Sequence, residues 1–360
     1  MLQKRVVVAM SGGVDSSLAA ALLKEADYEV IGVTMQIWPR QAPEWDRPGG
    51  CCGREAVEGA KRVAYKLGIS HHVMNLRDVF AQRVIADFCR EYSLGRTPNP
   101  CIRCNQYIKF DALLQRAKEL DADFIATGHY ARIDRSANGY RLLKAVDLSK
   151  DQSYFLYTLG QRELQHLLFP LGNLYKVEVR KRAAKLGLPA ASRPESQDIC
   201  FIPDNDYRLF VAKHIPLKSG EIVDTEGKVL GKHGGLAQYT VGQRQGLGLA
   251  SNRRLYVLKL DAASNRLVVG TKEQLLSNRL SARELRWVSG EASRELTNIT
   301  AKIRYKSPEA AAEIHLNNGM AQVQFDQPQR AITPGQAIVF YQGDVVLGGG
   351  IIEDADTILR

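Results

Sequence analysis

The sequence lacks a long apolar segment at its N-terminus. Residues 1–10 hold two basic side chains and only about five consecutive apolar residues before Ser11. A membrane helix needs roughly 20 such residues, and a secretory signal needs an apolar core of about 7–15. We therefore expect a soluble, cytoplasmic protein with no membrane partner.

Two common nucleotide-binding signatures are also missing. The glycine loop at residues 11–17, SGGVDSS, has neither the Gly-Lys-Ser/Thr ending of the Walker loop nor the spaced glycines of the dinucleotide fingerprint. These absences disfavour transfer of the γ-phosphate and binding of NAD. The chain also has no internal repeat and no low-complexity tract.

Acidic residues are outnumbered. The 360 residues include 49 Lys and Arg against 39 Asp and Glu, which gives a net charge of +10. Such an excess attracts a polyanion if it is gathered on one face. Composition alone leaves open an evenly distributed basic surface. The length predicts two or three domains.

The first half of the chain alternates short apolar runs with amphipathic stretches, which predicts a doubly wound parallel sheet over residues 1–205. Ligands of such α/β sheets bind beyond the carboxyl ends of the strands. We expect strands at 5–9, 29–37, 70–75 and 123–127 and helices at 15–26, 55–67 and 79–92.

The second half of the sequence lacks the alternating strand and helix pattern of the first half. Short glycine-rich strands predict a small β-rich central domain over residues 206–280, and alternating runs separated by turns predict a C-terminal β-barrel over 281–360. Residues 39–53 and 95–104 are rich in Pro and Gly, so we expect loops there, with a helix starting near Ile108.

The glycine loop joins the first expected strand to the first expected helix. Two glycines let backbone N–H groups converge on phosphate oxygens, while the helix N-terminus and the serine hydroxyls add donors. An ordinary glycine turn with an Asp or Ser N-cap would also satisfy these residues. The loop resembles the S-G-G-x-D-S motif of PP-loop ATP pyrophosphatases. Members split ATP into AMP and pyrophosphate, so the resemblance implies bound ATP, with Asp15 and the serines assisting Mg²⁺.

Six cysteines in a cytosolic chain of this length point away from a disulfide framework. Cys101 and Cys104 form one C-x-x-C pair, and a structural zinc site would need further ligands that no second pair supplies. A helix N-terminus and Arg103 would both lower a thiol pKa there. Cys200 lies in the segment ESQDICF, where a buried structural thiol is the alternative. Cys51 and Cys52 receive no role.

These motifs, together with Gly128-His129-Tyr130 and the segment at 150–153, resemble the tRNA-specific 2-thiouridylases over nearly the whole chain. The resemblance implies that the wobble uridine at position 34 of tRNA is adenylated and thiolated, with sulfur from a donor protein. It assigns Cys104 as nucleophile and Cys200 as the persulfide carrier, which then form a redox disulfide. It implies ATP contacts at Ala9, Met10, Ser11, Gly12, Gly13, Val14, Asp15, Ser16, Met35 and Gly128, and tRNA contacts at Lys150, Asp151, Gln152, Arg304 and Tyr305.

One position departs from the family. Many members have Asp where this chain has Cys101, so Cys101, Cys104 and Cys200 could alternatively hold an iron–sulfur cluster that supplies the sulfur. The persulfide pair is favoured, because both of its positions match the motif.

Two further readings stay open. Another AMP-forming PP-loop synthetase would explain the loop but not the cysteines, and a non-catalytic tRNA-binding protein would use the loop as a nucleotide sensor. If residues 300–306 form a regular strand, Arg304 and Tyr305 point to opposite faces and could both touch RNA only near a strand end or bulge. By default the basic face of that strand is simply solvated.

Overall fold

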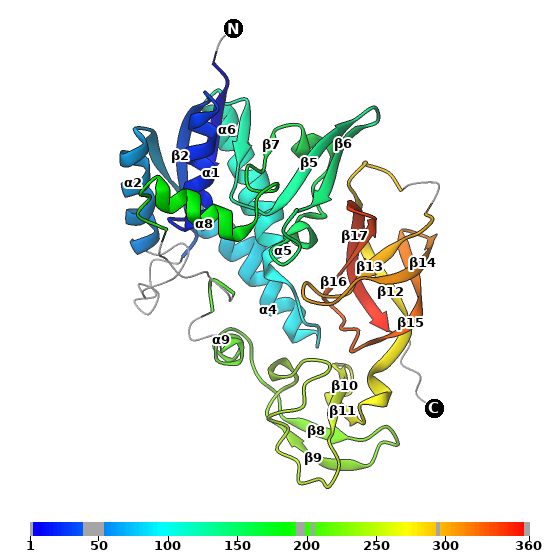
Figure 1. Ribbon diagram of the computed structural model, residues 1–360. Helices are drawn as coiled ribbons and strands as arrows, with labels where there is room; N and C mark the ends of the chain where they lie inside the picture. Colours follow the sequence, from blue (N-terminus) through cyan, green and yellow to red (C-terminus); the bar gives the residue numbers. More distant parts are fainter. Residues whose placement is uncertain (1–2, 39–53, 192–198, 203–205, 293–295, 356–360) are drawn as a thin grey trace.

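The computed structural model describes residues 3–38, 54–191, 199–202, 206–292 and 296–355. Cys51, Cys52 and most of the segment before Cys200 lie outside these ranges. Figure 1 shows a domain built on a parallel sheet, a small β-rich domain below it and a barrel beside it. Within the described ranges, no helix combines the length and hydropathy that crossing a membrane requires.

The first sheet has five strands in the order β3-β2-β1-β4-β7, and every neighbouring pair is parallel. The expected doubly wound sheet is therefore confirmed. Val6 and Val8 on β1 face one apolar cluster, and Val7 and Ala9 face another, so the strand is buried on both sides. The strands are β1 (Arg5–Ala9), β2 (Glu29–Gln36), β3 (Ser70–Asn75), β4 (Phe124–Ala126) and β7 (Leu167–Leu168).

Helices cover both faces of this sheet. On one face, α1 (Val14–Glu25), α2 (Arg54–Leu67) and α8 (Lys176–Lys185) share a core with Val6 and Val8. On the other face lies α6 (Leu113–Glu119), which packs against Val7 and Ala9. Two short elements, η4 (Ser153–Leu156) and α7 (Gln161–Leu164), follow in the chain.

Two long helices contain π-helical turns. The first runs through α3 (Arg77–Phe80), η2 (Ala81–Ile85) and α4 (Ala86–Ser93), and the second runs through α5 (Pro100–Arg103), η3 (Cys104–Ala112) and α6. The expectation of a helix start near Ile108 is wrong. The helix begins at Pro100 because Asn99 caps it, accepting the Cys101 N–H at 3.2 Å, and proline is favoured in the first turn. Cys101 and Cys104 therefore lie at its N-terminal end.

The C-terminal strands form the expected barrel, which closes where β12 pairs with β17. The hairpin of β5 (Ala131–Ser136) and β6 (Gly139–Lys144) comes from the first half of the chain but extends the barrel sheet through β17. The first and last parts of the chain therefore share one sheet. The barrel strands are β12 (Leu276–Trp287), β13 (Thr300–Lys302), β14 (Ala310–Asn317), β15 (Met320–Arg330), β16 (Ala337–Gln342) and β17 (Val345–Ala355).

The central part is a four-stranded sheet in the order β10-β11-β8-β9, preceded by the helix α9 (Tyr207–His214). Its strands are β8 (Gly220–Val223), β9 (Val229–His233), β10 (Tyr256–Asp261) and β11 (Arg266–Gly270), with short helices η6 (Leu236–Gln238) and η7 (Glu273–Leu275). The small β-rich domain expected from the glycine-rich texture is thus present.

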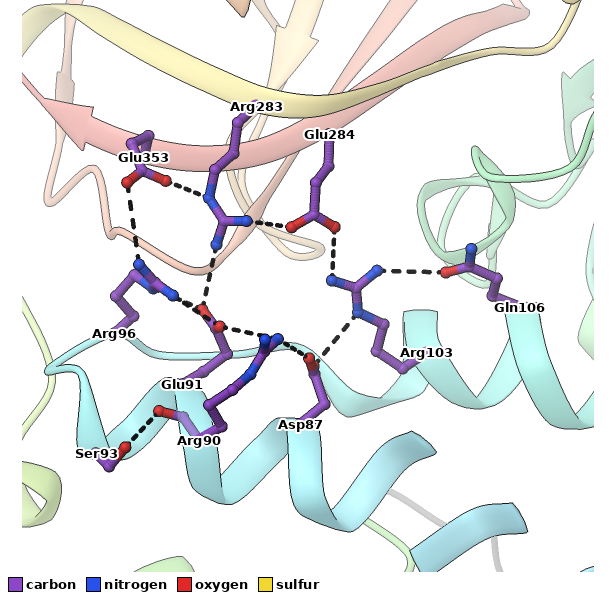
Figure 2. Close-up of polar contacts among 10 residues, drawn as sticks. All are labelled: Asp87, Arg90, Glu91, Ser93, Arg96, Arg103, Gln106, Arg283, Glu284 and Glu353. Carbon is purple, nitrogen blue, oxygen red and sulfur yellow. Dashed lines mark hydrogen bonds and ion pairs between the residues drawn. The ribbon is translucent and has the colours of Figure 1, made fainter. Parts of the chain in front are cut away.

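An ion-pair network joins the long helices to the barrel (Figure 2). Glu91, on α4, is 4 % exposed and accepts hydrogen bonds of 2.6 and 2.8 Å from Arg96. Arg283, on β12, reaches Glu91 at 3.5 Å and also pairs with Glu353 on β17. Arg103 reaches Glu284 of β12 at 2.8 Å. The helix that begins just before the cysteines is therefore tied to the barrel.

Glu284 lies at an irregularity of β12: its backbone is left-handed (φ 53°), and the pairing with β17 shifts register between Arg283 and Arg286. Burial by itself raises the pKa of its carboxyl group, but the hydrogen bond and charge of Arg103, with Arg283, hold that pKa below the ordinary value of 4.5. A carboxyl group whose pKa is lowered on folding stabilises the fold above its unfolded pKa and loses that effect as the pH falls through its folded pKa.

We therefore expect Glu284→Gln to lower the free energy of unfolding by about 1 kcal/mol at pH 7, a value reduced for solvent screening. The difference from the parent should shrink as the pH falls below about 4.5, where the carboxyl group of the unfolded chain takes up protons first and that of the folded parent follows at lower pH. Denaturant unfolding between pH 3.5 and 7 measures both effects. Glu226→Gln, at an exposed position in a central-domain turn, is the control. An undiminished difference at acidic pH would contradict the assignment.

Candidate active site

The glycine loop lies where the strand order of the parallel sheet reverses. β1 ends at Ala9 between β2 and β4, and the loop leads into α1. Gly12 has φ 70°, which suits glycine, and Ser16 accepts the Ser11 N–H at 3.1 Å. This reversal is the position at which doubly wound sheets bind ligands.

Gly128 packs directly against the start of α1. A Cβ atom built on it would lie 2.7 Å from the Ser16 backbone nitrogen and 2.8 Å from the Asp15 carbonyl carbon. Any larger residue would push the β4 end away from the loop. The loops after β1 and β4 therefore meet, as expected if both contact one ligand, and Gly128 has a packing role whether or not it touches ATP.

Asp15 is the centre of a hydrogen-bond network that the sequence did not reveal. The Nζ of Lys176 donates to both carboxylate oxygens at 2.7 Å, and the Tyr130 hydroxyl donates to Oδ1 at 2.8 Å. Lys176 is 7 % exposed. The cation is thus held beside the glycine loop. No motif marks Lys176, which begins α8 and lies 161 residues from Asp15.

Tyr130 connects this network to the segment at 150–153. Gln152 accepts the Tyr130 N–H at 3.0 Å through its side chain and donates its own N–H to the Tyr130 carbonyl at 2.8 Å. Asp151 is buried and accepts N–H groups from Ala145 and Ser153. Burial raises the pKa of Asp151 despite these bonds. Lys150, at the start of this turn, is half-buried. Two of these three expected tRNA contacts therefore also hold the turn together.

Met35, Cys104 and Cys200 pack against the same apolar cluster, which includes Phe88 and Phe201. Met35 lies near the carboxyl end of β2, Cys104 begins η3, and Cys200 follows the uncertain segment 192–198. Cys104 and Cys200 are half-buried thiols, whereas Cys101 is exposed. The structure thus places the two expected catalytic cysteines around one core that also borders the carboxyl edge of the sheet.

Arg103 does not have the expected surroundings. Its guanidinium pairs with Asp87 at 3.3 Å and Glu284 at 2.8 Å, and donates to Gln106 at 3.4 Å (Figure 2). Two carboxylates therefore compensate the charge that the sequence suggested would lower a thiol pKa. Arg103 links α5 to the barrel instead.

Arg304 and Tyr305 follow the end of β13, which stops at Lys302. The regular strand considered over 300–306 is therefore absent, and both residues lie just past a strand end. The Tyr305 ring lies against that of Phe155 at a tilt of 40°, with ring centroids 4.4 Å apart. Arg304 donates to the carbonyls of Val241 at 3.2 Å and Ala331 at 2.8 Å, so its guanidinium joins the barrel to the central domain.

The side chains that could act as metal ligands show whether a metal ion fits this site. Mg²⁺ is usually held by one or two carboxylates and by substrate phosphates, but the Asp15 carboxylate is already bonded to Lys176 and Tyr130. The described residues contain no group of three His, Cys, Asp or Glu side chains suited to a metal. In this arrangement Cys101, Cys104 and Cys200 do not form a three-thiolate site for an iron–sulfur cluster.

Family models match three consecutive parts of the chain. The tRNA methyl transferase HUP domain matches residues 4–204, the tRNA methyl transferase PRC-barrel domain matches 208–271, and the aminomethyltransferase beta-barrel domain matches 277–352. The first model covers more than half of the chain.

Curated relatives match almost the whole chain, and each is named tRNA-specific 2-thiouridylase MnmA. The protein of Halothermothrix orenii is 51 % identical over 97 % of this chain and 99 % of its own length. That of Heliobacterium modesticaldum is 54 % identical over 98 % and 93 %, and that of Acetivibrio thermocellus 50 % identical over 98 % and 100 %. The model descriptions mention methyl transfer, but identity of about one half along the full length is the stronger guide. The chain therefore belongs to the tRNA-specific 2-thiouridylase family of enzymes.

Proposed function

We propose that this enzyme makes 2-thiouridine at the wobble position of tRNA, using ATP and a sulfur atom carried on Cys200. The observation that carries the proposal is the shared packing of Met35, Cys104 and Cys200 around one apolar cluster beside the carboxyl edge of the sheet. An ATP-dependent activation and a transfer between two thiols need these parts in one place.

The first step activates the base. The C2 oxygen of uracil leaves poorly, so the oxygen attacks the α-phosphorus of ATP and pyrophosphate departs. The glycine loop and the N-terminus of α1 receive the phosphates, since both present backbone N–H groups. Lys176, held beside the loop by Asp15, adds a positive charge where negative charge develops. We assign no step to Mg²⁺, because its only carboxylate candidate in the loop is already bonded.

The second step transfers sulfur. The terminal sulfur of a Cys200 persulfide attacks C2, and AMP leaves with the former C2 oxygen. The Cys104 thiolate then attacks the inner sulfur, which breaks the sulfur–sulfur bond and releases the thiolated base. A disulfide between Cys104 and Cys200 remains, and an external thiol reductant must reduce it. A donor protein must then reload Cys200 with sulfur.

The reaction is tested with purified protein, unmodified tRNA, ATP and a persulfide donor. We expect 2-thiouridine, AMP and pyrophosphate in equal amounts, measured by mass spectrometry of the nucleosides and by pyrophosphate release. Pyrophosphate release without tRNA would favour another PP-loop synthetase. Absence of pyrophosphate release despite tRNA binding would favour a non-catalytic tRNA-binding protein, and a methylated uridine would overturn the proposal.

Cys101 separates the two sulfur mechanisms. Cys101 is exposed, whereas Cys104 and Cys200 are half-buried in one cluster. We therefore expect Cys101→Ala to keep most of the thiolation activity with a persulfide donor, because the pair works without it. The assay is repeated after anaerobic purification, with iron and sulfide analysis. An iron-loaded active parent beside an iron-free, inactive Cys101→Ala protein would instead establish the cluster mechanism.

A further inference from the structure

A pocket opens where the central domain meets the barrel, away from the glycine loop. Its volume is about 550 Å³. Residues from four segments line it: α9, the turn between η6 and β10, the start of β10, and the end of β15. The side chains that matter for the argument are Tyr207, Arg208, Gln243, Arg244, Tyr256 and Arg330.

The pocket is lined by positively charged side chains that form no ion pair with a carboxylate in the described ranges. Within the described ranges, Arg208, Arg244 and Arg330 have no carboxylate at ion-pair distance. This differs from Arg96 and Arg103, each of which binds carboxylates in the network of Figure 2. Three guanidinium groups around one hollow repel one another, so an anion bound there would relieve the repulsion.

Aromatic rings support two of these arginines. The Arg330 guanidinium lies 5.5 Å from the ring centre of Tyr256, and that of Arg208 lies 6.0 Å from the ring of Tyr207. Tyr207 is itself fixed, because its hydroxyl donates to the Gln238 carbonyl at 3.1 Å. Such contacts reduce the side-chain freedom that binding would otherwise remove.

Arg304 stabilises the backbone next to the residues that line the pocket. It donates to the carbonyls of Val241 and Ala331, which adjoin the lining residues Gly242 and Arg330. Its guanidinium is half-buried and engaged within the protein, so the exposed Arg244 and Arg330 are better placed to contact a ligand. In this arrangement Arg304 positions the pocket.

The helix α9 connects this pocket with the catalytic cysteines. Tyr207 and Arg208, at its start, line the pocket, while Phe210 and Val211 pack in the apolar cluster that contacts Cys104 and Cys200. Tyr207 also stacks on Tyr92 of α4, with ring centroids 5.2 Å apart. One short helix therefore contributes to both places.

We infer that this pocket binds a phosphodiester of the RNA substrate, at a position distinct from the reacting base. Arginine forks match phosphate oxygens, and tyrosine and glutamine side chains suit ribose and unpaired bases. The inference rests on the proposed function, since it assumes that RNA is the substrate. The ligand chemistry is a phosphate, which free inorganic phosphate could also supply.

The test is tRNA binding by the double variant Arg244→Gln/Arg330→Gln over a range of salt concentrations. We expect at least tenfold weaker binding at low salt and a salt slope reduced by about 1.5, because each lost phosphate contact accounts for roughly 0.7–0.9. The KM for tRNA should rise while kcat at saturating tRNA stays within about twofold. Arg62→Gln, an exposed arginine on α2, is the matched control.

The double variant Arg244→Lys/Arg330→Lys guards against a folding artefact. It keeps both charges and should restore the salt slope, though less of the affinity, because lysine lacks the fork. Unchanged tRNA affinity in the glutamine variant would overturn the inference. A titration with inorganic phosphate separates the sources: phosphate that binds the pocket without competing with tRNA contradicts an RNA site.

The proposed reaction and the proposed phosphate-binding pocket can be contradicted independently of each other. If no 2-thiouridine forms but tRNA binding still depends on Arg244 and Arg330, the proposed reaction is wrong and the pocket assignment stands. If 2-thiouridine forms and tRNA binding is indifferent to both arginines, the reaction stands and the pocket assignment is wrong.

Discussion

Asp15→Ala is expected to abolish formation of AMP and pyrophosphate, with a loss of at least about 100-fold, while tRNA affinity stays nearly unchanged. Asp15 holds the buried Lys176 cation beside the glycine loop through two bonds of 2.7 Å. Loss of a single preorganised group that stabilises developing charge typically costs a factor of about 10²–10³ in turnover. Pyrophosphate release and tRNA binding are measured on the same preparation.

Two controls define what the loss means. Asp78→Ala removes an exposed carboxylate from the first turn of α3, so it reproduces the change in helix-end charge away from the loop. Lys176→Gln tests whether Asp15 acts through the Lys176 cation. If it does, this variant should lose most of the same AMP and pyrophosphate formation. Full activity of Lys176→Gln beside an inactive Asp15→Ala protein would assign Asp15 to a metal ion instead. Unchanged turnover in Asp15→Ala would remove the loop from the mechanism.

The parallel sheet could be predicted because its signals are local. Each strand has its own apolar run, and the helix period follows at once, as at β1, α1 and β2. The start of α5 was missed although the cap signal was present. Asn99-Pro100 sits among turn-forming residues, and their composition outweighed an N-cap followed by proline in the first turn.

Contacts between distant segments could not be predicted. The β5–β6 hairpin joins β17 through the pairs Leu142–Val346 and Leu143–Val345, about 200 residues apart, and nothing in either segment specifies that partner. Likewise, nothing in the sequence around Lys176 or Asp15 specifies that these two side chains bond to each other. Residue roles inferred from the family locate positions along the chain, but they do not show what else those side chains hold, as Arg304 and Asp151 illustrate.

Substitutions of the two proposed catalytic cysteines should stop the reaction at different stages. Cys200→Ser has no persulfide, so we expect no 2-thiouridine while tRNA-dependent release of pyrophosphate continues. Cys104→Ser can still form the bond between the Cys200 persulfide and C2 of the base, but it has no thiolate to break the sulfur–sulfur bond. We therefore expect a covalent protein–tRNA adduct, seen as a slowly migrating band that dithiothreitol removes.

Cys89→Ala is the matched control for these variants, because burial raises the pKa of the Cys89 thiol to about 11 and leaves it protonated at neutral pH. It should thiolate tRNA at close to the parent rate. The adduct should be absent from Cys200→Ser and from the double variant Cys104→Ser/Cys200→Ser, since its formation needs the sulfur on Cys200. Thiolation at the parent rate by Cys104→Ser would show that another thiol or the external reductant releases the base, and an adduct that survives dithiothreitol would show that the base is not bound through a disulfide.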